Sequence, residues 1–258
     1  MKKEISESYL ISIVDKALDV ILELSHNEDI SIRELGKKLN ISKSTLYRIL
    51  RTLECKDFVR KDINNKKYLL GLKVFELGNT IKENFEIQNI SYPFMKNLQN
   101  LYKETVQLAI VDKETIFIIE TIEGTREIRI FSKAGQRFPM TYGNFAKIFL
   151  AQMPYNTILA LIKKYPLKKY AKNSIIDEEL FIKEIEKVKV KGVSVGINDP
   201  IDTAFSIAVP IFGYHKEVMA SIAISGANIP NNIKRLTQIE LSLKKASRQI
   251  SSQLGFKI

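Results

Sequence analysis

The decisive stretch of the chain is residues 31–71, SIRELGKKLNISKSTLYRILRTLECKDFVRKDINNKKYLLG. Within residues 42–54, four apolar side chains recur at the intervals i, i+3, i+4 and i+7, which gathers them on one face of a helix: Leu46, Ile49, Leu50 and Leu53. The opposite face carries a hydroxyl, a phenol and two guanidinium groups, from Ser44, Tyr47, Arg48 and Arg51. Such groups suit phosphates and base edges in the major groove of DNA.

Capping and turn signals surround this basic helix. Ser31 and Glu34 form an S-x-x-E capping box at the start of a short helix that ends near Leu39. Asn40 suits a left-handed turn, and Ser42 suits the N-cap of the basic helix. An earlier amphipathic helix is predicted over residues 12–25.

Two short strands are predicted after the basic helix. Residues 58–62 and 67–70 form a hairpin joined by residues 63–66, whose Asn64 and Asn65 favour a tight turn. Three cations lie near its tip: Lys61, Lys66 and Lys67. The order of helices and hairpin predicts a winged helix-turn-helix domain over residues 1–71.

The positive charge is concentrated in this region. The chain has 40 Lys and Arg against 29 Asp and Glu, a formal charge of +11. Residues 31–73 hold 12 Lys and Arg against four Asp and Glu, a net +8, which leaves +3 for the other 215 residues. A local basic patch favours binding to DNA. An architectural DNA-binding protein that needs no ligand remains the alternative, although it would carry basic charge over its whole surface.

Other classes of function find little support in the sequence. The chain has no P-loop and no H-E-x-x-H motif, and two histidines and one cysteine offer little for a metal site or a disulfide framework. We therefore expect neither an enzyme nor a bound cofactor or metal. No apolar run reaches the roughly 18–20 residues that span a bilayer, and the N-terminus does not resemble a signal peptide. A cytoplasmic protein without a membrane partner is expected.

The remainder of the chain predicts a linker helix over residues 72–87 and an α+β domain over residues 88–258. This domain opens with a helix that ends near Lys103. Six strands are predicted, at residues 105–111, 115–122, 127–132, 193–196, 204–212 and 218–225. Helices are predicted at residues 144–152, 155–163, 177–189 and 231–254. Strands grouped on either side of a helical insertion favour an antiparallel sheet.

Several of these segments resemble the IclR family of bacterial and archaeal transcription regulators, along nearly the whole chain. In the N-terminal part the similar segments are SIVDKALDVILEL (12–24), ISKSTLYRILRTLECKDFVRKD (41–62) and YLLGLKVFELG (68–78). In the C-terminal part they are AGQRFPMTYGNFAKIFLAQ (134–152), KGVSV (191–195) and SIAVPIFGYHKEVMASIAISG (206–226). The resemblance implies a GAF-like effector-binding domain, a homodimer or dimer of dimers, and a palindromic operator in double-stranded DNA.

The resemblance also implies an effector pocket, whose expected lining is Met140, Tyr142, Gly143, Asn144, Phe145, Asp199, Ser206 and Ser225. Several polar or small positions of the family differ here: Gly196 and Ala223 replace an acidic residue and a serine, and are expected to form the floor of the pocket below Phe145. A pocket with fewer hydrogen-bonding groups predicts a small, partly apolar or aromatic metabolite rather than a two- or three-carbon oxoacid. The alternative is a filled pocket that serves only dimer assembly.

The predicted DNA-facing residues are Ser42, Lys43, Ser44, Thr45, Tyr47, Arg48, Arg51, Lys61, Lys66 and Lys67. Tyr47 could either contact DNA or pack against its own helix. Lys66 stands where the family usually has glycine, which leaves the type of turn open. Cys55, among Leu53, Phe58 and Val59, is predicted to be a small buried thiol.

Overall fold

A computed structural model of the chain describes residues 10–26, 30–62, 66–83, 86–131, 133–227 and 233–256. The chain folds into two compact units, residues 1–84 and 85–258. Residues 63–65 of the predicted hairpin turn lie outside the described residues, as do residues 84–85 within the predicted linker helix, Ser132 at the end of a predicted strand and residues 231–232 at the start of the last predicted helix.

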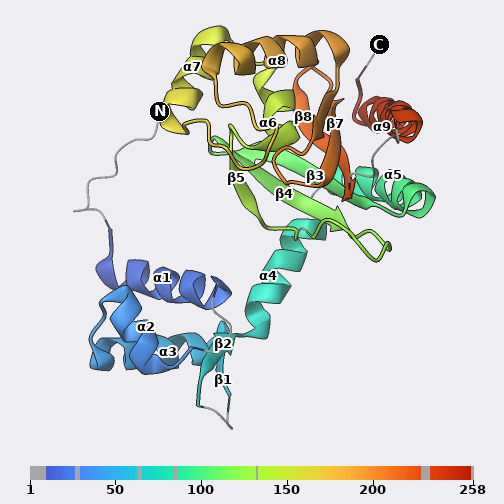
Figure 1. Ribbon diagram of the computed structural model, residues 1–258. Helices are drawn as coiled ribbons and strands as arrows, with labels where there is room; N and C mark the ends of the chain where they lie inside the picture. The colour runs from blue at the N-terminus through green and yellow to red at the C-terminus, as the bar shows by residue number, and fades with distance from the viewer. Residues whose placement is uncertain are drawn as a thin grey trace. The chain divides into compact units, whose positions relative to one another are not determined.

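The first unit is a winged helix-turn-helix, as predicted. Its elements are α1 (Ser12–His26), α2 (Ile32–Leu39), α3 (Lys43–Cys55), β1 (Val59–Lys61), β2 (Tyr68–Leu70) and α4 (Leu72–Glu83) (Figure 1). The core gathers side chains from the three packed helices and the hairpin, including Val20, Leu35, Leu46, Leu50 and Val59. The apolar stripe predicted for α3 is therefore the part of that helix which packs into the core.

The predicted helix ends are confirmed. The Ser31 hydroxyl accepts from the Glu34 backbone N–H, and the Glu34 carboxylate accepts from the Ser31 N–H, which completes the capping box. Asn40 takes the left-handed conformation with φ 51°. Ser42 caps α3 by accepting from the Thr45 N–H. These local interactions fix the turn between α2 and α3 and so the direction of the basic helix.

Gly71 closes the hairpin against the end of α3. Its N–H donates to the Phe58 carbonyl at 2.8 Å. A Cβ atom at this position would lie 2.0 Å from the backbone oxygen of Asp57, a distance that no side chain tolerates. Only glycine allows β2 to approach the α3–β1 turn so closely.

The second unit is built on a six-stranded antiparallel sheet in the order β5-β4-β3-β8-β7-β6. Its strands are β3 (Thr105–Asp112), β4 (Thr115–Ile122), β5 (Arg137–Pro139), β6 (Ser194–Ile197), β7 (Ala204–Phe212) and β8 (Val218–Ala227). Its helices are α5 (Glu86–Tyr102), α6 (Gly143–Leu150), α7 (Tyr155–Lys164), α8 (Glu178–Lys191) and α9 (Ile233–Gln253). The predicted α+β class is confirmed.

Helices cover both faces of this sheet (Figure 1). Ala220, Ile222 and Ile224 of β8 pack with α5 and α9, whereas Ala223 belongs to the core beneath α6, α7 and α8. Alternation along a strand separates the two sets, because successive side chains point to opposite faces. Ser225 continues the second set and so reaches the face covered by α6.

The strand predicted at residues 127–132 is wrong. Residues 127–131 form no strand, and Ile128 and Phe131 are 75% and 62% exposed. The outer edge of β4 pairs instead with β5, residues 137–139, and the Ile118 N–H donates to the Gln136 carbonyl. The alternation in residues 127–131 resembles a strand, but these residues pair with no strand; the Thr105 hydroxyl instead donates to the Ile130 carbonyl at 2.7 Å.

Candidate functional site

The polar face of α3 is open to solvent. Its exposed side chains are Lys43, Ser44, Tyr47, Arg48 and Arg51, whereas Thr45 is half-buried. Ser42 is exposed, but its hydroxyl is engaged at the start of the helix, where it also donates to the Thr45 Oγ1 at 2.9 Å. Tyr47 is 53% exposed and therefore extends away from the core. Most of the α3 side chains in the predicted set thus share one accessible surface.

The two arginines on this surface differ in their surroundings. The Arg51 NH1 lies 2.9 Å from the Glu54 Oε2. This hydrogen bond, together with the charge of Glu54, raises the pKa of Arg51 above its usual value. Arg48 makes no side-chain ion pair with any residue in the described part of the chain. Arg48 is free to meet a ligand, whereas Arg51 must first leave Glu54.

The prediction that Cys55 is buried is wrong, because the thiol is exposed. Cys55 follows Arg51 by four residues and Arg48 by seven, so it continues the polar face of α3 rather than the apolar stripe. Leu53 and Val59, its apolar sequence neighbours, pack into the core of the first unit from α3 and β1, whereas the Cys55 side chain faces solvent.

The hairpin presents two of the three predicted lysines. Lys61 and Lys66 are exposed, whereas Lys67 is half-buried and engaged with its surroundings. The Lys61 ammonium lies 5.6 Å from the centre of the Tyr68 ring. Lys66 has φ 60°, the left-handed conformation, which accounts for the glycine usual at this position in the family it resembles.

Apolar side chains also form an exposed stripe on α1 and at its start. Ile11, Val14, Leu18 and Leu22 follow the spacing i, i+3, i+7 and i+11, and each is half exposed or more. Leu72 and Phe75 on α4 are exposed as well. The first unit therefore leaves uncovered considerably more apolar surface than single scattered residues would give.

A cavity of about 230 Å³ lies in the second unit, on the face of the sheet covered by α6. It is lined by residues of β3, β4, β5, β7 and β8, by the first turn of α6, by Ile130, Phe131 and Gln136, and by residues 199–201. Seven of the eight predicted residues line it: Tyr142, Gly143, Asn144, Phe145, Asp199, Ser206 and Ser225. The fold thus brings together residues that are up to 83 positions apart in the sequence.

The eighth residue, Met140, does not line this cavity. Its side chain is fully buried in the core beneath α6 and α7. The Tyr142 N–H donates to the Pro139 carbonyl, which reverses the chain after β5 and turns Met140 away from its neighbours Phe138 and Tyr142. The sequence pattern could not show this reversal.

The expected floor of Gly196 and Ala223 is also wrong, since neither residue lines the cavity. Ala223 is buried in the core. A Cβ atom at Gly196 would lie 2.5 Å from the Asn144 Nδ2, so Gly196 provides the space that the Asn144 amide occupies. Two residues that appear unrelated in the sequence are therefore a matched pair.

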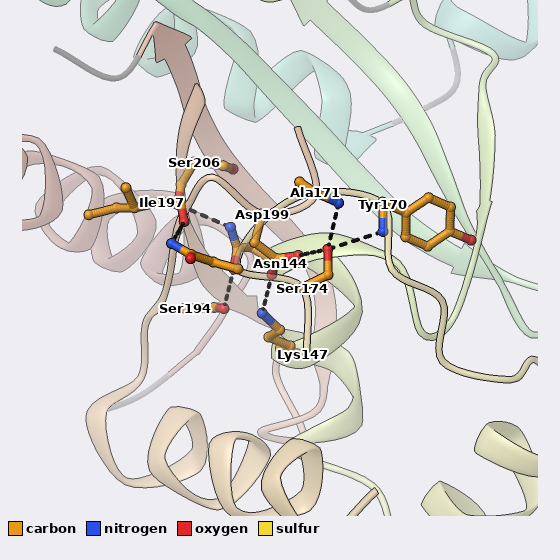
Figure 2. Close-up of polar contacts among 10 residues, drawn as sticks. Asn144, Lys147, Tyr170, Ala171, Ser174, Ser194, Ile197, Asp199 and Ser206 are labelled. Carbon is orange, nitrogen blue, oxygen red and sulfur yellow. Dashed lines mark hydrogen bonds and ion pairs between the residues drawn. The ribbon is translucent and has the colours of Figure 1, made fainter. Parts of the chain in front are cut away.

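Figure 2 shows the polar network around the first turn of α6. The Asn144 Nδ2 donates to the Ser206 carbonyl at 3.1 Å, and the Ser194 hydroxyl donates to the Asn144 Oδ1 at 2.7 Å. The Lys147 ammonium donates to the Asp199 Oδ2 at 2.8 Å, and the Ser174 hydroxyl donates to the Asp199 Oδ1 at 3.0 Å. Both carboxylate oxygens of Asp199 are thus held in place.

Aromatic rings form much of the remaining wall. Tyr142 stacks on Phe138 with the ring centres 4.8 Å apart, and Tyr170 meets the Tyr142 ring edge-on at the same distance. Burial, with smaller contributions from Tyr170 and Asp199, raises the pKa of Tyr142 above its usual value. The phenol therefore stays protonated and uncharged at neutral pH.

Sequence reasoning missed several lining residues, including Gln107, Ile116, Ile118, Phe138 and Phe205. The alternating burial of β4 is the signal that could have found Ile116 and Ile118, because both point to one face of the sheet. The segment GVSVG at residues 192–196 matches the G-x-S-x-G pattern of serine hydrolases. Its Ser194, however, is buried within β6 and donates to Asn144.

Each of the two units matches the model of a known protein family. The family model described as Bacterial transcriptional regulator IclR C-terminal matches residues 80–252, and the model of the MarR family matches residues 15–66. The first of these covers more than half of the chain. The chain belongs to the IclR family. Its members are DNA-binding transcriptional regulators, and the expectation of a regulator rather than an enzyme is confirmed.

IclR-family relatives resemble the protein over nearly its whole length. The HTH-type transcriptional regulator KdgR of Escherichia coli is 28% identical, over 95% of this chain and 94% of KdgR. The crystal structure of the Thermotoga maritima IclR is 26% identical with a TM-score of 0.81, over 96% of this chain and all of that one. An IclR homologue from Microbacterium hydrocarbonoxydans, complexed with 4-hydroxybenzoate, has a TM-score of 0.82 at 17% identity, over 94% and 98% of the two chains.

Within the described part of the chain, no helix is long and apolar enough to cross a membrane.

Proposed function

We propose that this IclR-family regulator binds a palindromic operator as a homodimer or dimer of dimers, and that a small metabolite in the cavity of its second unit controls this binding. In this proposal residues 1–71 form the DNA-binding domain, and residues 88–258 form the domain that holds the metabolite and supports assembly. Residues 72–87 are the linker between these two domains. The observation that carries the proposal is the exposed basic face of α3 beside a lysine-bearing hairpin. Because a transcription regulator acts on the chromosome, we also propose that the protein works in the cytoplasm.

The α3 surface supplies the groups for reading DNA. Arg48 and Arg51 can each form two hydrogen bonds to a guanine edge, and Ser44 and Lys43 can meet phosphates near the start of the helix. Tyr47 is accessible to the same groove. A gel shift with DNA from the promoter of the protein's own gene and with random DNA, over a range of salt, tests this role. Equal affinity for both DNAs at every salt concentration would favour an architectural protein.

The hairpin lysines are expected to contact phosphates rather than bases. Lys61→Ala and Lys66→Ala should weaken specific and random DNA binding alike and should each lower the salt slope by about one unit. Lys67→Ala should do less, because Lys67 is half-buried and already engaged. Fluorescence anisotropy over a salt series measures these slopes. A change in sequence preference alone would instead assign base reading to the hairpin.

The homodimer is supported by the apolar stripe on α1. Single recognition helices cover only a few base pairs, and symmetric half-sites repeat with each turn of B-DNA, so a twofold dimer matches a palindromic operator. The stripe of Ile11, Val14, Leu18 and Leu22 offers a self-complementary surface for such a dimer.

The proposed ligand is a small, partly apolar or aromatic metabolite. A cavity of about 230 Å³ has room for one ring with short substituents, since an engineered cavity of about 150 Å³ holds benzene. Phe131, Phe138 and Phe145 contribute apolar wall, and burial against such surface yields about 25 cal/mol per Å². The aromatic compound bound to the Microbacterium homologue fits the same size class.

A thermal-shift screen with small organic acids, aromatic compounds and sugar acids tests the ligand class. An aromatic ligand at about 100 times its Kd should raise the melting temperature by roughly 5–10 °C. Stabilisation by glyoxylate or pyruvate that is lost in Ser225→Ala would contradict the proposed class. If no compound stabilises the protein, the cavity serves only assembly.

A further inference from the structure

Part of the cavity wall comes from a segment that belongs to no helix or strand. Residues 124–130 run between β4 and β5, and we call them the strap. Ile130 and the residue that follows it, Phe131, line the cavity. Within the described part of the chain, residues 126–131 make no hydrogen bond between backbone groups. The position of the strap therefore depends on side chains that attach it to the sheet.

The Thr105 hydroxyl holds both ends of the strap. It donates to the Ile130 carbonyl at 2.7 Å and accepts from the Gly124 N–H at 3.1 Å. Thr105 is fully buried at the start of β3. A hydroxyl has the donor and the acceptor that this double contact needs. One side chain thus joins two backbone groups that lie six residues apart in the sequence.

Thr105 lies on the cavity face of the sheet without lining the cavity. It pairs directly with Ser225 of β8, and residues opposite each other on adjacent strands present their side chains on the same face. Ser225 lines the cavity, whereas Thr105 does not. Ile130 both accepts the hydrogen bond from Thr105 and lines the cavity, so the attachment of the strap and the wall of the cavity meet at this residue.

Glu104 provides a second anchor for the strap. Its carboxylate is 1% exposed, and the Oε1 atom lies 2.9 Å from the Arg126 Nε and 2.5 Å from the Arg235 NH2. Arg126 belongs to the strap, and Arg235 to the first turn of α9. Because the Arg126 side chain is 41% exposed, water screens its ion pair. The buried hydrogen bonds of Thr105 are therefore expected to be the stronger anchor.

The position of the strap matters because of Phe131. This residue lines the cavity but is 62% exposed, so protein contacts cover less than half of it. A ligand that packs on Ile130 and Phe131 gains affinity from the burial of apolar surface. That gain is available only while the strap is attached, since an unattached strap would have to be ordered at the expense of binding.

We propose that Thr105 is a positioning residue of the metabolite site: its hydroxyl holds the strap on the sheet and thereby places Ile130 and Phe131 against the ligand. This inference rests on the proposed role of the cavity as a metabolite site. By thermodynamic linkage the effect is reciprocal, so a ligand that packs on these two residues also holds the strap more firmly.

Thr105→Val and Thr105→Ser form a matched pair, because valine has the shape of threonine without the hydroxyl and serine keeps the hydroxyl. Trypsin reports the attachment of the strap, since it cleaves after Arg126 and Arg129 when the local backbone opens. We expect initial cleavage at these sites, located by mass spectrometry, to be at least about 10-fold faster in Thr105→Val. Thr105→Ser should restore the original rate. Arg126→Met, which removes the weaker anchor, should accelerate cleavage after Arg129 by a smaller factor.

Thr121→Val is the control for the loss of a buried hydroxyl. Thr121 pairs with Gln107 on the same face of the sheet, but its Oγ1 has no hydrogen-bond partner among the described residues. This variant should leave the cleavage rates of the strap unchanged. Circular dichroism and thermal unfolding establish that each variant is folded. If Thr105→Val does not fold, Thr105→Ala takes its place, because it removes the same hydroxyl.

Isothermal titration calorimetry with phenol and with 4-hydroxybenzoate measures the effect on binding by the full-length protein. For each probe that the unmodified protein binds, Thr105→Val should lower the affinity by about 10-fold. Thr105→Ser and Thr121→Val should keep the original affinity. A bound probe should also slow trypsin cleavage after Arg126 and Arg129 in the unmodified protein.

Either of two results in a folded Thr105→Val protein would overturn the proposal: unchanged cleavage of the strap, or unchanged affinity for a probe that binds. An equal loss of affinity in Thr121→Val would also overturn it, because the effect would then come from general destabilisation of the sheet. If neither probe binds the unmodified protein, the aromatic metabolite site itself is contradicted, while the cleavage rates still decide whether Thr105 holds the strap.

Discussion

Replacing Leu18 and Leu22 together by glutamine is expected to lower the affinity for a palindromic operator by about 10²–10⁴-fold. Both side chains are more than half exposed on α1 and belong to the stripe assigned to the dimer. When the two recognition helices are no longer joined, each half-site is bound separately and the gain from the second contact is lost. Glutamine adds no charge, so the general attraction of the unit for DNA is unchanged.

Light scattering and fluorescence anisotropy measure the assembly state and the affinity in the same samples. The matched control is Leu180→Gln with Val190→Gln, two exposed apolar residues of α8 in the second unit. These substitutions should leave both quantities as in the unmodified protein. A Leu18, Leu22 variant that is monomeric yet binds the full operator at the original affinity would refute the dimer assignment.

Arg48→Ala is expected to weaken operator binding by about 1–3 kcal/mol, or roughly 5- to 150-fold, if Arg48 contacts a guanine through both of its terminal nitrogens. Its side chain makes no ion pair with a described residue, so the interaction with DNA replaces only water. Arg51→Ala should cost less, because Arg51 gives up its contact with Glu54 on binding. Glu54→Gln should accordingly strengthen binding.

Competition with DNA in which single operator positions are changed shows whether these variants lose specificity or only affinity. Arg129→Ala serves as the control, since Arg129 is an exposed arginine of the second unit with a long contact of 3.6 Å to Glu123. Unchanged operator affinity in folded Arg48→Ala and Arg51→Ala proteins would show that α3 is not the DNA-recognition helix.

The first unit follows closely from its sequence because its signals are local. The capping box of Ser31 and Glu34, the left-handed Asn40 and the stripe on α3 each depend on residues within one or two helical turns. The solvent-facing set on α3 follows from the same period. The exposure of Cys55 also follows from the helical period, because Cys55 continues the face of α3 that carries Arg48 and Arg51.

The second unit shows where sequence patterns reach their limit. Residues 127–131 alternate like a strand, yet they pair with no strand, and β4 pairs instead with residues 137–139, which follow later in the chain. Met140 was predicted to line the cavity, but the chain reverses after Pro139 and the Met140 side chain lies in the core instead. Seven of the eight predicted cavity residues lie at the cavity, and their positions came from the resemblance to a family rather than from any local pattern.

The sequence by itself determined the helices and the hairpin of the first unit, the apolar face of α3 and the basic surface opposite, because periodicity and capping act between near neighbours in the chain. Only the tertiary structure decided that Gly196 makes room for Asn144 and that Lys147 neutralises Asp199, 52 residues away. Such pairs form when separate elements pack against one another, and the charge of the cavity wall follows from that packing rather than from composition.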